Sequence, residues 1–218
     1  MPHSGSARSE LPLERLVREG LDELGIGPRI ASDLARLAEL LHSWARRISL
    51  TGHRSPDAIA RRLVLDAIAL ERQLPETDSV ADLGAGAGFP GLPIAIARPG
   101  CRVSLVEARE RRHHFQRAAV RELGLERVNP IRGRAEALEP REHGIALAQA
   151  MGKPDQVAHW LLPWVAPGGL LVIPGAEAPP KVGPIPGLSP ARVVSYAVPL
   201  GGARRTLWLA RRSAGFGA

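Results

Sequence analysis

The chain has 218 residues, of which 44% are hydrophobic, and it carries a formal net charge of +7. That length is enough for one domain with a substantial core, or for one domain and an appendage. No apolar run approaches the roughly eighteen residues that a membrane span needs. A single cysteine, Cys101, excludes an intramolecular disulfide and a multi-cysteine metal site. We therefore expect a cytoplasmic protein without a membrane segment or a metal ion.

The positive charge comes almost entirely from arginine, since Lys153 and Lys181 are the only lysines. Guanidinium groups pair with phosphate in a bidentate geometry and stack on bases. The charge is therefore compatible with a nucleic-acid partner, although arginines spread over a solvated surface would give the same composition.

The N-terminal third is expected to be helical. Residues 1–8 lack the apolar core of a signal peptide and are expected to form a flexible tail. Between residues 9 and 75, apolar side chains recur at helical spacing in three runs, residues 13–24, 30–44 and 59–70. Ser55-Pro56-Asp57 is a start signal for the third run, because proline is favourable in the first turn of a helix. We interpret residues 9–75 as an N-terminal helical extension.

A glycine-rich turn follows the first expected strand, residues 80–83. Gly84, Gly86 and Gly88 alternate there, and glycine lets the backbone turn sharply and a ligand lie against it. The Gly-x-Gly-x-Gly spacing differs from the Gly-x-Gly-x-x-Gly of dinucleotide enzymes. Asp82 stands two residues before the first glycine. A carboxylate there suits a cofactor that carries an ammonium group and no pyrophosphate, which describes S-adenosylmethionine.

An acidic residue about twenty positions further on, at the end of the next strand, should hold the ribose hydroxyls of such a cofactor. Glu107 fills this place after the expected strand at residues 102–106. An ordinary turn between strand and helix, without any ligand, remains the alternative.

The remainder of the chain continues as strands and helices in alternation. Further strands are expected at residues 128–132, 145–150, 169–173, 192–198 and 206–211, and helices at residues 92–98, 109–123 and 157–165. Such an alternation produces a parallel sheet with right-handed crossovers, and the last two strands should form an antiparallel hairpin. For residues 76–218 we predict a Rossmann-like α/β domain of the class I methyltransferase type, with a mostly parallel seven-stranded sheet that binds S-adenosylmethionine.

With these residues in place, the chain resembles the bacterial small-subunit ribosomal RNA methyltransferase G family, also called glucose-inhibited division protein B. The resemblance covers roughly residues 37–209, and its most specific part is the run DLGAGAGFPGLP at residues 82–93. Gly133-Arg134-Ala135-Glu136 is a weaker match. The family methylates N7 of one guanine in 16S ribosomal RNA, so the resemblance implies ribosomal RNA or the small ribosomal subunit as partner.

The resemblance also implies roles for individual residues. Besides Asp82 and Glu107, the cofactor would be bound by the turn and by one later segment, namely Gly84, Ala85, Gly86, Gly88, Phe89, Ala135 and Glu136. Three basic positions would face the RNA: Arg111, Arg134 and Arg204. No catalytic base is expected, because guanine N7 carries a lone pair and reacts without losing a proton. Orientation of the two substrates would then supply most of the rate.

The chain departs from the family where the substrate is expected. The Ser-Arg-Ala that usually follows the fourth strand reads Ala148-Gln149-Ala150, so a basic residue is missing near the cofactor. Two alternatives to rRNA methylation therefore stay open. One is the same fold acting on a small molecule or a protein, and the other is an RNA-binding paralogue without enzymatic activity.

Overall fold

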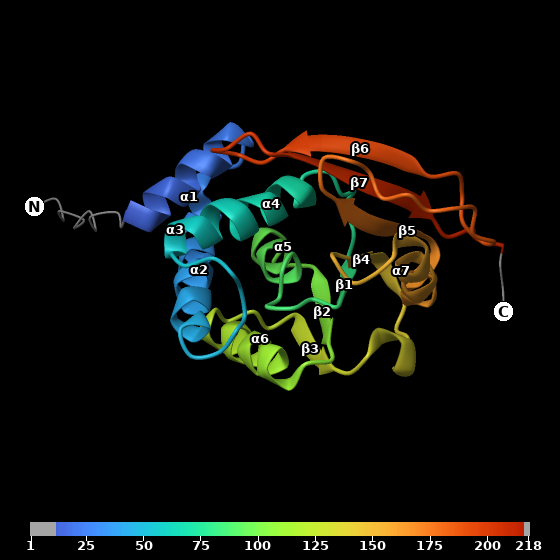
Figure 1. The fold of residues 1–218 in the computed structure, drawn as a ribbon, viewed down its shortest axis with the longest axis horizontal. Helices are drawn as coiled ribbons and strands as arrows, with labels where there is room; N and C mark the ends of the chain where they lie inside the picture. Colours follow the sequence, from blue (N-terminus) through green and yellow to red (C-terminus); the bar gives the residue numbers. More distant parts are fainter. Residues whose placement is uncertain (1–11, 216–218) are drawn as a thin grey trace, which may run out of the picture.

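The computed structural model describes residues 12–215, so the expected tail at residues 1–8 lies outside the described part. The described residues form one sheet of seven strands in the order β3-β2-β1-β4-β5-β7-β6, with helices on both faces (Figure 1). Strands β1 to β5 run parallel, while β7 is antiparallel to both β5 and β6. The predicted fold class is confirmed.

The strands are β1 (Ser79–Leu83), β2 (Arg102–Glu107), β3 (Val128–Arg132), β4 (His143–Ala148), β5 (Val165–Gly175), β6 (Arg192–Ala197) and β7 (Arg204–Arg211). The α-helices are α1 (Pro12–Glu23), α2 (Ala31–Ala45), α3 (Pro56–Ile59), α4 (Leu65–Glu71), α5 (Gly91–Ala97), α6 (Glu110–Glu122) and α7 (Pro154–Leu161). Short 3₁₀ segments lie at η1 (Pro28–Ile30), η3 (Ala135–Ala137) and η4 (Leu162–Trp164), and the π-helical segment η2 (Ala60–Val64) joins α3 to α4. Within residues 12–215, no helix is long and apolar enough to cross a membrane.

The central strands of the sheet are buried on both faces, and their alternating side chains belong to two hydrophobic clusters. Ile145 and Leu147 of β4 join the cluster that contains α1, α2, α4, α5 and α6, while Ala146 and Ala148 join the cluster that contains α7. Successive side chains of a strand point to opposite faces. The apolar runs of the central strands follow from this double cover, as in other parallel sheets.

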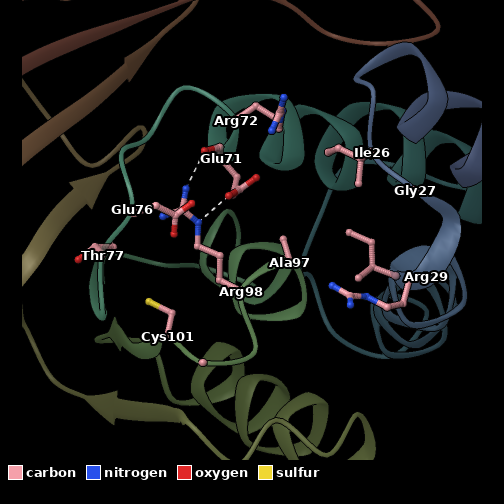
Figure 2. Close-up of a pocket in the computed structure, with 12 residues that line it drawn as sticks. Ile26, Gly27, Arg29, Glu71, Arg72, Glu76, Thr77, Ala97, Arg98 and Cys101 are labelled. Carbon is pink, nitrogen blue, oxygen red and sulfur yellow. Dashed lines mark hydrogen bonds and ion pairs between the residues drawn. The ribbon is translucent and has the colours of Figure 1, made fainter.

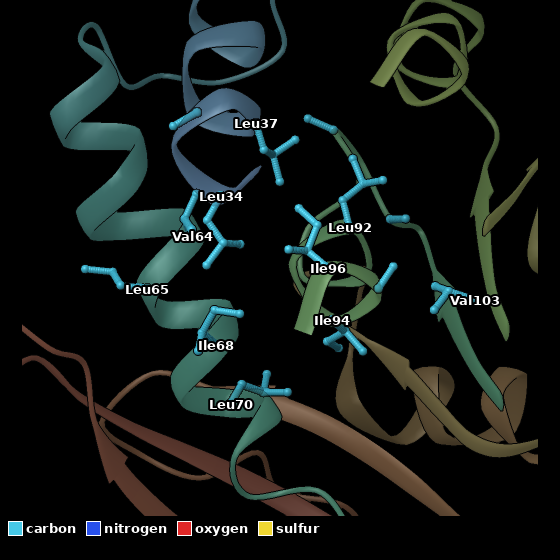
Figure 3. Packing of buried hydrophobic residues seen from close by; sticks show 14 of the residues in the cluster. Leu34, Leu37, Val64, Leu65, Ile68, Leu70, Leu92, Ile94, Ile96 and Val103 are labelled. Carbon is cyan, nitrogen blue, oxygen red and sulfur yellow. The ribbon is translucent and has the colours of Figure 1, made fainter. Parts of the chain in front are cut away.

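The N-terminal helices pack on the same face as α5 and α6. Leu34 and Leu37 of α2 meet Ile68 of α4 and Leu92 of α5 in one apolar layer (Figure 3). Gly20 lets α1 approach this layer closely, because a Cβ there would collide with the side chain of Leu65. The helical extension and the sheet domain therefore share a hydrophobic core.

Asp66 joins the helical extension to the C-terminal hairpin. This residue of α4 is 8% exposed; its Oδ1 accepts a hydrogen bond from Tyr196 Oη at 3.0 Å and its Oδ2 one from Arg205 Nε at 2.9 Å. Burial of the phenol, together with the nearby carboxylate, raises the pKa of Tyr196. The partners lie 130 and 139 residues away in the chain, so these hydrogen bonds link helix α4 to the C-terminal hairpin.

Some element boundaries differ from those predicted. Strand β4 ends at Ala148, and Gln149-Ala150 belongs to the following turn, where Ala150 has φ +53°. Strand β5 begins at Val165, so that Pro167-Gly168-Gly169 lies inside it and not before it. The pairing of β4 with β5 shifts register between His143 and Ile145, so the early part of β5 is irregular, as a bulge is.

Candidate functional site

A cavity of about 250 Å³ lies where β1 and β2 end. Its walls come from four segments that follow strands, and the lining residues are Gly84, Val106, Glu107, Ala108, Arg109, Arg112, Gly133, Arg134, Ala135, Glu136, Ala150, Met151 and Trp160. Ligands of open α/β sheets bind outside the carboxyl ends of the strands. Position alone therefore makes this cavity the candidate site.

The glycine turn has the backbone conformation that its sequence requires. Gly84, Gly86 and Gly88 have φ of +65°, +59° and +83°, values that residues with a Cβ rarely adopt. A Cβ on Gly84 would lie 2.8 Å from Sδ of Met151, whereas a Cβ on Gly86 would find no atom nearer than Nη1 of Arg112 at 3.8 Å. The turn is thus tightly packed at its first glycine and open at its second.

Asp82, at the end of β1, connects this strand to the start of α5. It is 1% exposed, and its Oδ2 accepts a hydrogen bond from the backbone N–H of Gly91, the first residue of α5, at 2.9 Å. Its Oδ1 is buried without a partner among the described residues. Desolvation raises the pKa of Asp82 to about 7, the hydrogen bond from Gly91 partly opposes this rise, and the charge of Glu107 adds to it. One carboxylate oxygen of Asp82 is therefore without a donor, but it is buried, and Asp82 is not among the residues that line the cavity.

Glu107 connects the turn to the helix that follows β2. Its Oε2 accepts from the backbone N–H of Gly86 at 3.0 Å, and its Oε1 accepts from that of Arg109 at 2.7 Å. It is 5% exposed and lines the cavity. A carboxylate oxygen can accept more than one hydrogen bond, so Glu107 retains capacity for a ligand hydroxyl.

Several lining residues were not predicted by the sequence analysis, and three of them, Arg112, Met151 and Trp160, have large side chains. Nη1 of Arg112 lies 3.8 Å from Oε2 of Glu107, while Met151 and Trp160 close the cavity from the segment after β4. Trp160 lines the cavity, whereas Trp164, four residues further along, is 1% exposed and belongs to the hydrophobic core. Arg111 and Arg112 are adjacent on α6, and the sequence does not show which of them faces the cavity. In the structure Arg112 lines it, while Arg111 is exposed.

The residues expected to bind the cofactor are not all equally placed. Four of them, Gly84, Glu107, Ala135 and Glu136, line the cavity together with Arg134. Gly88 is packed against Leu92, while Phe89 is half-buried beside the larger hydrophobic cluster. Ala85 is 2% exposed, and its N–H donates to the carbonyl of Val106 at 2.9 Å. These three shape the turn but do not line the cavity, and neither do Asp82 and Gly86.

The three arginines expected to face RNA are exposed and lie apart from one another in the chain. Arg111 is near the start of α6, and Arg134 follows β3, 3.7 Å from Oε1 of Glu136. Arg204 begins β7, whose neighbour Thr206 pairs with Gly175 at the end of β5. All three therefore lie on the side of the sheet where the parallel strands have their carboxyl ends and where the cavity lies.

A second cavity, of about 690 Å³, lies at the amino ends of the strands, where Thr77 precedes β1 and Cys101 precedes β2 (Figure 2). Arg98 crosses it from the end of α5. Its guanidinium bonds Oε1 of Glu71 at 2.5 Å and the carbonyl oxygens of Leu74 and Pro75 at 3.1 and 2.7 Å. Arg98 thus caps the end of α4, and the cavity lies at the edge where ligands of this fold do not bind.

No group of three or more His, Cys, Asp or Glu side chains that could hold a metal ion occurs between residues 12 and 215.

Sequence comparison assigns the chain to a family. Residues 30–179 match the model of the family described as rRNA small subunit methyltransferase G. A protein of that name from Stenotrophomonas maltophilia is 38% identical over 169 residues, which cover 75% of this chain and 79% of the relative. One from Geobacter sulfurreducens is 34% identical over 207 residues, 88% of this chain and 94% of the relative. For a relative from Frankia alni the match is 38% identical and spans only 57% of its length.

The structural comparison agrees at the level of the fold. A putative O-methyltransferase from Klebsiella pneumoniae superposes with a TM-score of 0.61 at 17% identity, and the match covers 89% of this chain and 94% of that one. At this level of identity the likeness concerns the architecture alone.

Proposed function

The chain belongs to the rRNA small subunit methyltransferase G family, and we propose that it transfers a methyl group from S-adenosylmethionine to N7 of a guanine in 16S ribosomal RNA. The observation that carries the proposal is the cavity at the carboxyl ends of β1 and β2, which brings the glycine turn and Glu107 together. The action on ribosomal RNA or the small subunit would take place in the cytoplasm.

The residues of the site fit the proposed cofactor. Glu107 would bind the ribose hydroxyls, and Ala135 with Glu136 would line the adenine. The unpartnered Oδ1 of Asp82 is an acceptor without a donor, which the cofactor's ammonium group would supply. The cavity of about 250 Å³ is a little below the range of about 300–1,000 Å³ typical of ligand pockets, so Arg112 and Met151 would move outward on binding.

When bound, S-adenosylmethionine supplies an electrophilic methyl group. Guanine N7 is nucleophilic as it stands, so no side chain has to remove a proton. The protein's part is to hold the base in line with the methyl group and to exclude water, which can account for several kcal/mol of a barrier. Two carboxylates line the cavity, Glu107 and Glu136; both would contact the cofactor, and the chemistry requires neither to act as a base.

The RNA side of the site would depend on phosphate contacts. Arg111, Arg134 and Arg204 are exposed at the cavity edge of the sheet, where their guanidinium groups can pair with the backbone of a folded RNA. Such contacts place the substrate without reading its sequence. Gln149 is exposed after β4, at the position where the family usually has an arginine, and its neutral amide does not replace that charge.

Two measurements test the proposal. Calorimetry should show binding of S-adenosylmethionine by the wild type and its loss in Gly86→Arg, because the side chain would fill the open face of the turn. Glu122→Gln, at the far end of α6, is the matched control and should bind normally. Methyl transfer is then followed by mass mapping of 16S RNA, offered both as naked RNA and as small subunits.

The outcomes separate the proposal from its alternatives. Labelled guanine N7 in either RNA substrate supports it. Cofactor binding without labelled RNA would favour the same fold acting on a small molecule or protein. Salt-dependent RNA binding without cofactor binding would favour a non-enzymatic RNA-binding role.

A further inference from the structure

Both backbone polar groups of Gly86 are held by side chains. The N–H donates to Oε2 of Glu107 at 3.0 Å, and the carbonyl oxygen accepts from Nε2 of Gln116 at 2.9 Å. Gln116 lies on α6, 30 residues further along the chain. The second glycine of the turn, with φ +59°, is therefore clamped between the end of β2 and the middle of α6.

Gln116 is an unfavourable residue for its position if stability alone is considered. It is fully buried, and its Oε1 has no hydrogen-bond partner among the described residues. A buried acceptor without a donor is destabilising, and an apolar side chain of similar size would avoid that cost, although the Gly86 carbonyl would then lose its donor. Its neighbours Phe115 and Ala119 on α6 are buried and apolar. The bond to Gly86 is what the amide contributes here.

Three hydrogen bonds and the backbone of α6 together form a closed ring that includes these two contacts of Gly86. Glu107 accepts from Arg109, the N-cap residue of α6, at 2.7 Å, and Gln116 follows Arg109 two helical turns later. The ring runs from Glu107 to Arg109, along α6 to Gln116, across to Gly86 and back to Glu107. A shift of the turn would therefore move the carboxylate, and a shift of the helix would move both.

We propose that Gln116 is a positioning residue for the cofactor site, which holds Gly86 so that its N–H keeps Glu107 directed at the ribose. Gln116 is not among the residues that line the cavity, so it acts through Gly86. The inference deepens the proposed function and rests on it. It assigns to a buried amide of α6 a part of the affinity for the nucleoside half of the methyl donor.

The test compares Gln116→Leu and Gln116→Met with the wild type. Each should bind S-adenosylmethionine and S-adenosylhomocysteine about tenfold more weakly. The melting temperature should change little, because the unpaired Oε1 is removed while the Gly86 carbonyl loses its donor. In turnover, KM for the cofactor should rise about tenfold while kcat at saturating cofactor stays unchanged. Gln73→Leu is the matched control, since its Nε2 also donates to a backbone carbonyl, that of Ala69 at 3.3 Å, away from the cavity.

Gln116→Glu provides a readout that a merely structural role would not give. A buried carboxyl is neutral at low pH and can then donate to the Gly86 carbonyl, but its anion would repel it. Affinity should match the wild type at low pH and fall as pH rises, after division by the wild-type value at each pH. That division removes the contributions of Asp82, Glu107, Arg112 and His113, which surround the turn and α6.

The possible results are distinct. If the wild type does not bind the cofactor, the proposed function itself fails. If the wild type binds and Gln116→Leu binds equally well, the clamp has no part in positioning and the inference is overturned. Should both apolar variants lose stability, the Glu variant decides at a temperature where it is folded: affinity independent of pH would also overturn the inference.

Discussion

The buried carboxyl of Asp82 gives the most direct test of the site. It sits beneath the glycine turn, 1% exposed, with one oxygen bonded to the N–H of Gly91 and the other without a partner among the described residues. Such a group destabilises the free protein when it is ionised. Replacement by asparagine keeps an oxygen for Gly91 and removes the charge, so Asp82→Asn should separate the stability of the turn from its function.

The magnitude follows from the pKa. The pKa of Asp82 is about 7 in the folded protein and has an ordinary value of 3.8. Ionisation of this carboxyl therefore lowers the free energy of unfolding by about 4 kcal/mol, at about 1.36 kcal/mol for each pKa unit. Because the folded pKa is raised, the folded protein keeps a proton that the unfolded chain has lost between pH 3.8 and about 7. Stability from this group therefore falls as pH rises through that interval and stays low above it.

The variant should lose this pH dependence. Its amide NH₂ would replace the unpartnered oxygen and itself lack an acceptor, at a cost of about 1–3 kcal/mol, so the net gain in stability at pH 8 should be about 1–3 kcal/mol. Urea denaturation of the cofactor-free protein at pH 4, 6 and 8 measures this gain. Asp78→Asn is the control: Asp78 is exposed, and a hydrogen bond from Ser79 is the largest cause lowering its pKa, so the wild-type slope should remain.

The same variant reports on the ammonium group. If the free oxygen of Asp82 receives it, Asp82→Asn should bind S-adenosylmethionine about 10–100-fold more weakly although it is more stable, as expected for loss of a hydrogen bond between charged groups. An equal pH slope in wild type and variant would refute the burial argument. Higher stability with unchanged affinity would limit Asp82 to holding the turn.

Three further outcomes are expected. Arg98→Met should destabilise the protein by about 3–5 kcal/mol in urea titration, because Glu71 is left as an unpaired buried charge, yet cofactor affinity should not change since the pair lies at the opposite edge. Asp66→Ala should cost about 2 kcal/mol by the same measurement, a smaller loss because its partner Arg205 is partly exposed. Arg111→Gln should weaken RNA binding and lower the slope of log affinity against log salt by about one, whereas an unchanged slope would exclude a phosphate contact.

The sequence predicted the sheet and the place of the site because both follow from local rules. Apolar runs broken by glycine predict buried strands and turns, and an acidic residue at the end of the second strand must lie beside the first turn when neighbouring strands are parallel. Glu107 meets Gly86 for that reason. The antiparallel hairpin of β6 and β7 was predicted in the same way, whereas the order of the strands was not predicted.

The contacts between distant segments were not predictable from these rules. Gln116 and Arg112 reach the site because α6 packs with one particular side against the sheet, which their spacing alone leaves undetermined. Asp66 meets partners more than a hundred residues away, and no local pattern indicates them. The proline and glycines of Pro167-Gly168-Gly169 suggest a loop, yet β5 includes them, and Gly168 and Gly169 form main-chain hydrogen bonds with the distant Arg212.

The helical extension is also a support of the cofactor site. Trp44 of α2 packs edge-on against Phe115 of α6, with ring centroids 5.7 Å apart, and Arg36 of α2 donates to the carbonyl of Glu122, the last residue of α6, at 3.0 Å. These contacts join α2 to α6 at Phe115, immediately before Gln116, and at the last residue of α6. Because Gln116 fixes Gly86 and Gly86 fixes Glu107, the orientation of α2 is transmitted to the carboxylate in the cavity. Under the proposed role of Gln116, a shift of the extension relative to α6 would therefore alter the site.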